Sequence, residues 1–211
     1  MGNTGKYSYY VEDKALEVTD RPRRFLEAFA AVLQHSNYSL PLEVFTRLST
    51  KCSRCAASCQ LYESTGRDED IPCHRSEMLF KIYRRYFTKS GILKARLFGG
   101  FTLTDEYLDR LAEAAYRCTA CRRCKSTCPM GIDHGLVTHL TRWLLSEIDV
   151  IPKALLVATR EQLEGVGNTS AISVPGLKDT CEFLEEEFQD IYGVDEVKFP
   201  IDVEGAEYVF F

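Results

Sequence analysis

The sequence has 211 residues, of which 45% are hydrophobic and 27% are charged, a composition typical of a soluble globular protein. The formal net charge of −5 argues against nucleic acid as the main partner, because no excess of Lys and Arg is available to neutralise phosphates. The apolar runs are far shorter than the ~20 residues of a membrane-spanning helix, and the polar start of the chain is unlike a signal peptide. We therefore expect a cytoplasmic protein without a transmembrane segment of its own; attachment to a membrane through a partner is the alternative.

The first fifty residues predict a polar extension followed by two helices. Residues 1–20 are polar and irregular. Asp20 offers a helix cap, Pro22 stands in the first turn, and apolar residues then recur at helical spacing. A second helix is expected from Pro41 to Leu48, and it leads directly into the first group of cysteines.

The segment between the two groups of cysteines predicts a helix, a loop and another helix. The first helix is expected over 73–88, and its basic side is either a solvated face or a docking surface for an acidic partner. That side carries Lys81, Arg84, Arg85 and Lys89. Residues 91–100 are expected to form a loop, and Thr104 then caps a helix that leads to Cys118. The chain therefore repeats a unit of helix, cysteine loop and helix.

Eight of the nine cysteines fall into two groups. The first group is Cys52, Cys55, Cys59 and Cys73; the second is Cys118, Cys121, Cys124 and Cys128, followed by Pro129. Cysteines three apart on a helix shift by about 60° per step around its axis, so the second group must wrap around a compact object. Pro129 biases Cys128 toward an extended conformation, which directs its sulfur away from the other three. This C-x2-C-x2-C-x3-C-P run is typical of 4Fe–4S ligation, in which the fourth cysteine binds the other cluster of a pair.

Two 4Fe–4S clusters are therefore the predicted cofactors. A four-thiolate zinc site is the first alternative, but zinc requires neither the third thiolate at this spacing nor the Cys-Pro step. Disulfides are disfavoured by the odd count of 9 cysteines and by the dense CxxC packing. The ninth cysteine, Cys181, lies in an apolar stripe, so we expect it to pack in a core, with a metal role as the alternative.

Charged and imidazole side chains near the cysteines are candidates for tuning the clusters. A cluster with four thiolates is anionic, and nearby positive charge would offset it. The candidates are Arg54, Arg117, Arg122, Arg123 and Lys125. His74 and His134 lie next to the motifs, and they are candidates for tuning a cluster through hydrogen bonds around its cysteine ligands.

The residues after Pro129 predict three more helices and a short strand. The helices are expected over 136–148, 152–165 and 177–192, and residues 197–211 have a β-like pattern. We expect Ala206 to Phe211 to add a strand to a partner's sheet. The predicted fold class is mainly α, with a short β segment at the C-terminus. Its predicted parts are 1–40, an N-terminal extension and helix; 41–150, a two-cluster domain; and 151–211, a helical segment ending in a strand.

Two stretches carry a resemblance to a known family: KCSRCAASCQLYESTGRDEDIPC and RCTACRRCKSTCPMGID. They resemble the two-cluster α-helical ferredoxin domain of heterodisulfide reductase-like iron–sulfur proteins, which is also found in glycolate oxidase iron–sulfur subunits and in membrane-linked complexes of sulfate reducers. The similarity runs roughly from Phe45 to Ile148. Longer relatives continue into a cysteine-rich catalytic domain with a CCG motif, and these 211 residues contain no CCG motif.

The resemblance implies an electron-transfer subunit that has no substrate site of its own. Its expected role is to relay single electrons through two 4Fe–4S clusters in a larger oxidoreductase, beside a CCG-domain or flavin-containing subunit. The alternative is a structural or redox-sensing iron–sulfur module. Whether the chain counts as an enzyme is left open.

The resemblance also implies how the ligands are divided. Cys59 matches the fourth, cross-ligating cysteine of glycolate oxidase-like subunits, and Cys73 is the nearby cysteine that can replace a missing local thiolate. The predicted division is Cys52, Cys55, Cys73 and Cys128 for one cluster, and Cys118, Cys121, Cys124 and Cys59 for the other. The competing assignment exchanges Cys59 and Cys73.

Overall fold

The computed structural model describes residues 20–168, 170–193, 197–205 and 207. Contacts within the chain define two units, Met1–Lys153 and Ala154–Phe211, and each is described by itself. Every regular element within the described residues is a helix, so the prediction of a mainly α protein is confirmed. The C-terminal strand is not confirmed: residues 197–205 and 207 form coil and turns, and the other residues of the segment Ala206 to Phe211 lie outside the described residues.

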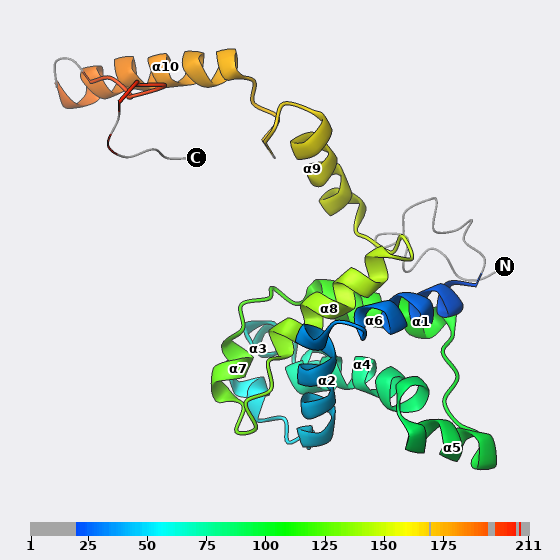
Figure 1. The fold of residues 1–211 in the computed structure, drawn as a ribbon. Coiled ribbons are helices and arrows are strands. Elements are labelled where there is room, and N and C mark those ends of the chain that lie inside the picture. Colours follow the sequence, from blue (N-terminus) through cyan, green and yellow to red (C-terminus); the bar gives the residue numbers. More distant parts are fainter. Residues whose placement is uncertain (1–19, 169, 194–196, 206, 208–211) are drawn as a thin grey trace. The chain divides into compact units, whose positions relative to one another are not determined.

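The first unit contains ten helical elements within the described residues (Figure 1). They are α1 (Arg21–Val32), α2 (Ser36–Leu48), the 3₁₀ turn η2 (Arg54–Ser58), α3 (Gln60–Thr65), the 3₁₀ turn η3 (Asp68–Asp70), α4 (Pro72–Phe87), α5 (Lys89–Phe98), α6 (Asp105–Arg117), α7 (Arg123–Thr127) and α8 (His134–Ser146). The second unit contains α9 (Lys153–Glu164) and α10 (Val174–Tyr192).

Helices α1, α4, α6 and α8 pack around the core of the first unit. Their apolar residues recur at helical spacing, and each helix therefore turns one stripe inward. The fully buried side chains include Phe25, Phe29, Phe80, Leu108 and Leu144. Burial stabilises each such side chain by about 1.5–3 kcal/mol relative to exposure. This core holds the ends of α2, α4 and α6, from which the cysteine segments extend.

Two helix starts are fixed by the predicted caps. Asp20 accepts a hydrogen bond from the backbone N–H of Arg23 at the start of α1. Thr104 accepts one from the backbone N–H of Tyr107 at the start of α6. Each cap satisfies a donor that the first turn of a helix would otherwise leave unpaired.

The prediction of a loop over 91–100 is wrong for most of its length, because α5 runs from Lys89 to Phe98. Thr88 caps α5 by accepting a hydrogen bond from the N–H of Gly91. A Cβ at position 91 would lie 1.8 Å from the carbonyl oxygen of Arg84. Gly91 therefore allows α5 to pack closely against the end of α4, a role that its sequence context does not reveal.

The second unit consists of two exposed helices. No side chain of this unit is buried within the part of the chain that the structure describes. The apolar stripe of α10, which includes Leu177 and Phe188, is exposed, and Cys181 is only half-buried. The expected core position of Cys181 is therefore not found. Across the described residues, no helix is long and apolar enough to cross a bilayer.

Candidate metal centre

Two hollows in the first unit are each lined by four cysteines. Cys52, Cys55, Cys73 and Cys128 line the first hollow. Cys118, Cys121, Cys124 and Cys59 line the second hollow. The structure thus groups the eight cysteines in the same two sets of four as the predicted division, whereas the competing assignment would exchange Cys59 and Cys73. Their role as ligands stays a prediction.

The two cysteine loops have the same local geometry. Each has the spacing C-x2-C-x3-C, starting at Cys52 and at Cys121. The residue after the first cysteine, Ser53 or Arg122, adopts the left-handed conformation, with φ of 56° and 61° respectively. A short helical turn follows in each loop and buries the second cysteine, Cys55 in η2 and Cys124 in α7.

The loops also touch at equivalent positions. Ser58 and Thr127 are 69 residues apart in the chain, and their hydroxyl oxygens are 2.9 Å apart. Each hydroxyl oxygen also lies near the carbonyl of the buried cysteine of its own loop, at 3.1 Å for Ser58 and 3.3 Å for Thr127. One hydroxyl therefore donates to the other, and the second donates to its own carbonyl. The helices that precede the loops, α2 and α6, both have 13 residues. The repeat of helix and cysteine loop is therefore present in three dimensions.

The last cysteine of each loop lines the hollow of the other loop. Cys59 and Cys128 both have extended backbone, with ψ of 105° and 116°, and so leave the path of the preceding helical turn. Pro129 accounts for this conformation at Cys128, as predicted. Cys59 has no proline after it, but it is the N-cap of α3, a position at which extended backbone is usual.

One cysteine position differs between the two loops. Cys118 lines the second hollow three residues before Cys121, whereas the corresponding residue of the first loop is Ser49, which lines the first hollow. Cys73, at the start of α4, supplies the fourth thiol there. If Cys52 is aligned with Cys118, as the first cysteine of each motif, the equivalence of Ser49 and Cys118 is missed. The C-x2-C-x3-C spacing shared by both loops aligns Cys52 with Cys121 and would have revealed it.

The thiols differ in how readily they lose a proton. A hydrogen bond between Cys55 and Cys73 raises the pKa of Cys55, with burial adding to the rise, and lowers the pKa of Cys73. Burial raises the pKa of Cys124 to about 11. The backbone N–H of Arg123 lowers the pKa of Cys121. Because a metal binds the thiolate, loading these sites must release protons, above all from Cys55 and Cys124, whose pKa values are raised.

The two histidines next to the motifs make second contacts around the first hollow. His74 donates through Nδ1 to the carbonyl of Asp68 at 2.9 Å, so its Nε2 accepts from the hydroxyl of Ser53 at 3.1 Å. His134 lines the first hollow, and its Nδ1 lies 2.8 Å from the hydroxyl of Ser76. Burial lowers the pKa of His134 to about 4, so this imidazole is neutral at pH 7.

Each of the five basic residues singled out from the sequence either forms an ion pair with a carboxylate or is exposed to solvent. Arg122 and Lys125 share the buried carboxylate of Asp133. Burial alone would raise the pKa of Asp133, but the hydrogen bonds from Arg122 and from the Leu136 N–H outweigh it and hold that pKa below its usual range. Arg54 and Arg123 are exposed, and Arg117 forms ion pairs with two carboxylates.

A different arginine, Arg75, is the basic residue buried beside a hollow. It lies on α4 with 7% of its surface exposed and lines the second hollow. The sequence places it in a helix with many charged residues, and no spacing distinguishes it from its exposed neighbours. Its contacts are taken up below.

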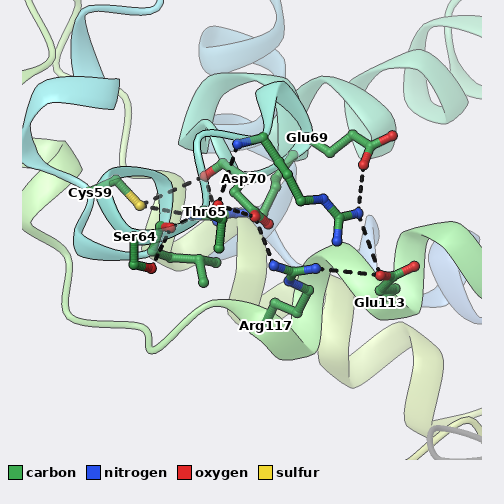
Figure 2. Close-up of polar contacts among 10 residues, drawn as sticks. Cys59, Ser64, Thr65, Glu69, Asp70, Glu113 and Arg117 are labelled. Atoms are coloured by element: carbon green, nitrogen blue, oxygen red, sulfur yellow. Dashed lines mark hydrogen bonds and ion pairs between the residues drawn. The ribbon is translucent and has the colours of Figure 1, made fainter.

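The buried carboxylate of Asp70 joins the two cysteine regions (Figure 2). Asp70 is 1% exposed; its Oδ2 accepts hydrogen bonds from Thr65 at 2.7 Å and from Arg117 at 2.9 Å. Its carbonyl oxygen lies 3.7 Å from the sulfur of Cys59. Asp70 therefore links the turn that leads to Cys73 with the end of α6, which leads to Cys118.

The donor set fits an iron–sulfur cluster in each hollow. Four thiols around each space match the Cys₄ ligation of a 4Fe–4S cluster. No group of three or more His, Cys, Asp or Glu side chains in the described residues is placed to hold a single ion.

Residues 50–132 match the family model described as "4Fe-4S dicluster domain". The chain is also similar to the "Hdr-like menaquinol oxidoreductase iron-sulfur subunit 2" of Archaeoglobus fulgidus, with 30% identity over 88% of this chain and 33% of the relative. The "Hdr-like menaquinol oxidoreductase iron-sulfur subunit" of Archaeoglobus profundus is 28% identical over 88% of this chain and 32% of the relative. No solved structure matches the chain.

A third relative is similar over a shorter stretch. It is a subunit of the dihydromethanophenazine:CoB–CoM heterodisulfide reductase of Methanosarcina acetivorans, with 31% identity over 40% of this chain and 20% of the relative. The chain spans about a third of the length of the first two relatives. The resemblance to heterodisulfide reductase-like iron–sulfur proteins and the prediction of two 4Fe–4S clusters are confirmed.

The Asp70 contact generates a stability prediction. Asp70→Asn removes the buried anion that pairs with Arg117, so we expect the free energy of unfolding to fall by about 3 kcal/mol. Urea unfolding of the loaded protein, compared at equal iron content, measures the change. Glu69→Gln is the matched control, because Glu69 belongs to an exposed pair with Arg67 and should change stability by less than about 0.5 kcal/mol. Equal losses in the two variants would contradict the role given to Asp70.

Proposed function

We propose that this chain, whose residues 50–132 match a 4Fe–4S dicluster domain, is the electron-relay part of a larger heterodisulfide reductase-like oxidoreductase. The observation that carries the proposal is the pair of four-cysteine hollows whose loops exchange their last cysteine. Bound 4Fe–4S clusters supply one-electron redox chemistry at potentials that the surrounding protein sets. The chain itself holds them, spaces them and fixes the charges around them.

In this proposal Cys52, Cys55, Cys73 and Cys128 hold the first cluster. The second cluster is held by Cys118, Cys121, Cys124 and Cys59. Cys124 and Cys128 lie on different hollows although they are four residues apart, which is about 6 Å of helical rise. So short a connection keeps the two sites close enough for rapid electron exchange.

The donor or acceptor is proposed to be a partner subunit with a CCG domain or a flavin. The relatives are named as subunits, and the chain spans only about a third of the first two of them, so a substrate site is assigned to another domain or subunit. The names of two relatives include menaquinol oxidoreductase, and this supports a cytoplasmic chain that reaches a membrane through its partner.

A basic cleft away from the cysteines is the proposed docking surface for that partner. It is lined by α2, α4, α5 and the turn after α5, and its charged lining consists of Arg47, Lys81, Arg84, Arg85, Lys89, Lys94 and one acid, Glu43. Some of the charge is offset, because Arg47 pairs with Glu43 and Arg84 pairs with Glu77. The remaining excess of positive charge suits an acidic partner surface, which it would attract at a distance.

The first prediction separates the predicted division of ligands from its competitor. Cys73→Ser should abolish or alter the signal of the Cys52 site and spare that of the Cys118 site, whereas Cys59→Ser should do the reverse. The iron content of each variant should fall toward about half of the parent value, because one of two equal clusters is affected. Electron paramagnetic resonance of the reduced proteins reads out both sites. An exchanged pattern would establish the competing assignment.

The second prediction separates an electron relay from a structural or sensing module. The anaerobically purified protein should take up one electron at each of two clusters reversibly, and the spectrum of the fully reduced protein should show magnetic coupling between them. The coupling is expected because the two sites share the short α7 connection. A single oxygen-labile cluster that does not change redox state would instead favour the sensor.

The third prediction concerns the basic cleft. Once the partner subunit has been identified by purification of the native complex, the double variant Lys89→Glu/Lys94→Glu should associate with it at least tenfold more slowly at low salt. The difference should shrink at high salt, because exposed charges are then screened. Lys178→Glu, on α10, is the control for a general change of charge. An unchanged association rate would remove the cleft as the docking surface.

A further inference from the structure

We propose that Arg75 is the fixed counter-cation of the second cluster site and that it makes this site the one with the higher reduction potential. The inference rests on the proposed function, because it requires a cluster in each hollow. It adds an order to the relay: the Cys118 site accepts an electron before the Cys52 site, and an electron passes from the Cys52 site to the Cys118 site.

The contacts of Arg75 fix its guanidinium beside the second hollow. One terminal nitrogen, Nη1, donates to the carbonyl of Asp70 at 2.8 Å. The other, Nη2, lies 4.0 Å from the sulfur of Cys59, which lines the same hollow. The Nε–H is buried and has no hydrogen-bond partner. The protein therefore fixes the orientation of the guanidinium, and its Nε–H is left without a hydrogen-bond partner.

Within the described residues, the charge of Arg75 has no carboxylate to balance it. No carboxylate within the described residues lies within 4.0 Å of its guanidinium. Asp70 offers it only a carbonyl, because the Asp70 carboxylate pairs with Arg117. Arg21 shows the usual alternative: it is almost equally buried, at 8% exposed, and it pairs with Asp105 and Asp109.

An unbalanced buried guanidinium implies an anion in the hollow. Removing a charge from water is costly unless an opposite charge compensates it, and an arginine does not lose its proton in a protein. Four thiolates around a 4Fe–4S core carry net negative charge, so a cluster in the second hollow supplies the missing anion. Arg75 thus belongs to the cluster site although it is not a ligand.

The first hollow has no equivalent of this charge in the described residues. Its basic lining consists of Lys51 and the imidazole of His134. Lys51 is exposed and forms an ion pair with Glu77 at 3.0 Å. In the second hollow, the other basic residue, Arg122, is offset by Asp133. Arg75 is therefore the charge that distinguishes the two sites.

The direction of the effect follows from electrostatics. Reduction adds an electron to an already anionic cluster, and a nearby cation favours the more negative state, which raises the reduction potential. The low dielectric around a buried charge strengthens this interaction.

The test is a potentiometric titration of the full chain, followed by electron paramagnetic resonance, with the two signals assigned by the Cys73→Ser and Cys59→Ser variants. Arg75→Gln should shift the reduction equilibrium of the Cys118 site by about tenfold toward the oxidised form, or about 59 mV for one electron. The Cys52 site should stay near its parent value. Arg75→Lys keeps the positive charge, so the reduction potential of the Cys118 site should stay close to its parent value in this variant.

Arg122→Gln is the matched control, since this arginine lines the same hollow but shares its charge with Asp133; we expect it to move the Cys118 site by less than half as much as Arg75→Gln. A parent-like titration of Arg75→Gln, or equal shifts at both sites, would overturn the inference. If Arg75→Gln binds too little iron to be titrated, Arg75→Lys is titrated instead. In Arg75→Lys the Cys118 site should still be reduced before the Cys52 site, and the reverse order would overturn the inference.

The proposed function fails separately from this inference. A parent protein without two reducible clusters contradicts the relay itself, whereas two reducible clusters with no effect of Arg75 contradict only the role of Arg75.

Discussion

The exchange of Cys59 and Cys128 between the two loops is the constraint on which the rest of the first unit depends. Each hollow takes three cysteines from one half of the unit and its fourth from the other. Neither set of thiols is complete unless both halves are folded and docked. The core of α1, α4, α6 and α8, the buried Asp70–Arg117 ion pair and the Ser58–Thr127 contact all hold the two halves in that docked arrangement.

The parts of the fold that the sequence predicts are those with local causes. The cap at Thr104 and the extended conformation of Cys128 before Pro129 each depend on a few neighbouring residues. Failures occur where the cause lies elsewhere in the fold. The sequence around Gly91 favours a loop, because the close approach of this residue to the carbonyl of Arg84 exists only after α5 has packed against α4.

The candidate site shows the same limit. The eight cysteines follow from their spacing, but their charge environment does not. Five basic residues next to the motifs are natural candidates, and three of them, Arg117, Arg122 and Lys125, are offset by Asp70, Glu113 and Asp133. Arg75 has no such carboxylate within the described residues: Asp70 offers it only a carbonyl, because the Asp70 carboxylate pairs with Arg117. This arrangement depends on how α4, α6 and the turn between α3 and α4 meet. Burial and pairing of charges are properties of the tertiary structure.

Ser58 and Thr127 occupy equivalent positions in the two cysteine loops and contact each other, as residues at a twofold symmetry axis do. In a twofold homodimer, residues at the axis meet their own copies, and both active centres must be identical. Here equivalent residues meet within one chain, so the two halves are free to differ, as Ser49 and Cys118 do. A symmetric pair of centres would have no preferred direction of electron flow. Because both halves belong to one chain, the residues around the two cysteine sites can differ although the backbone is nearly symmetric. Electron transfer between the two sites can then have a preferred direction.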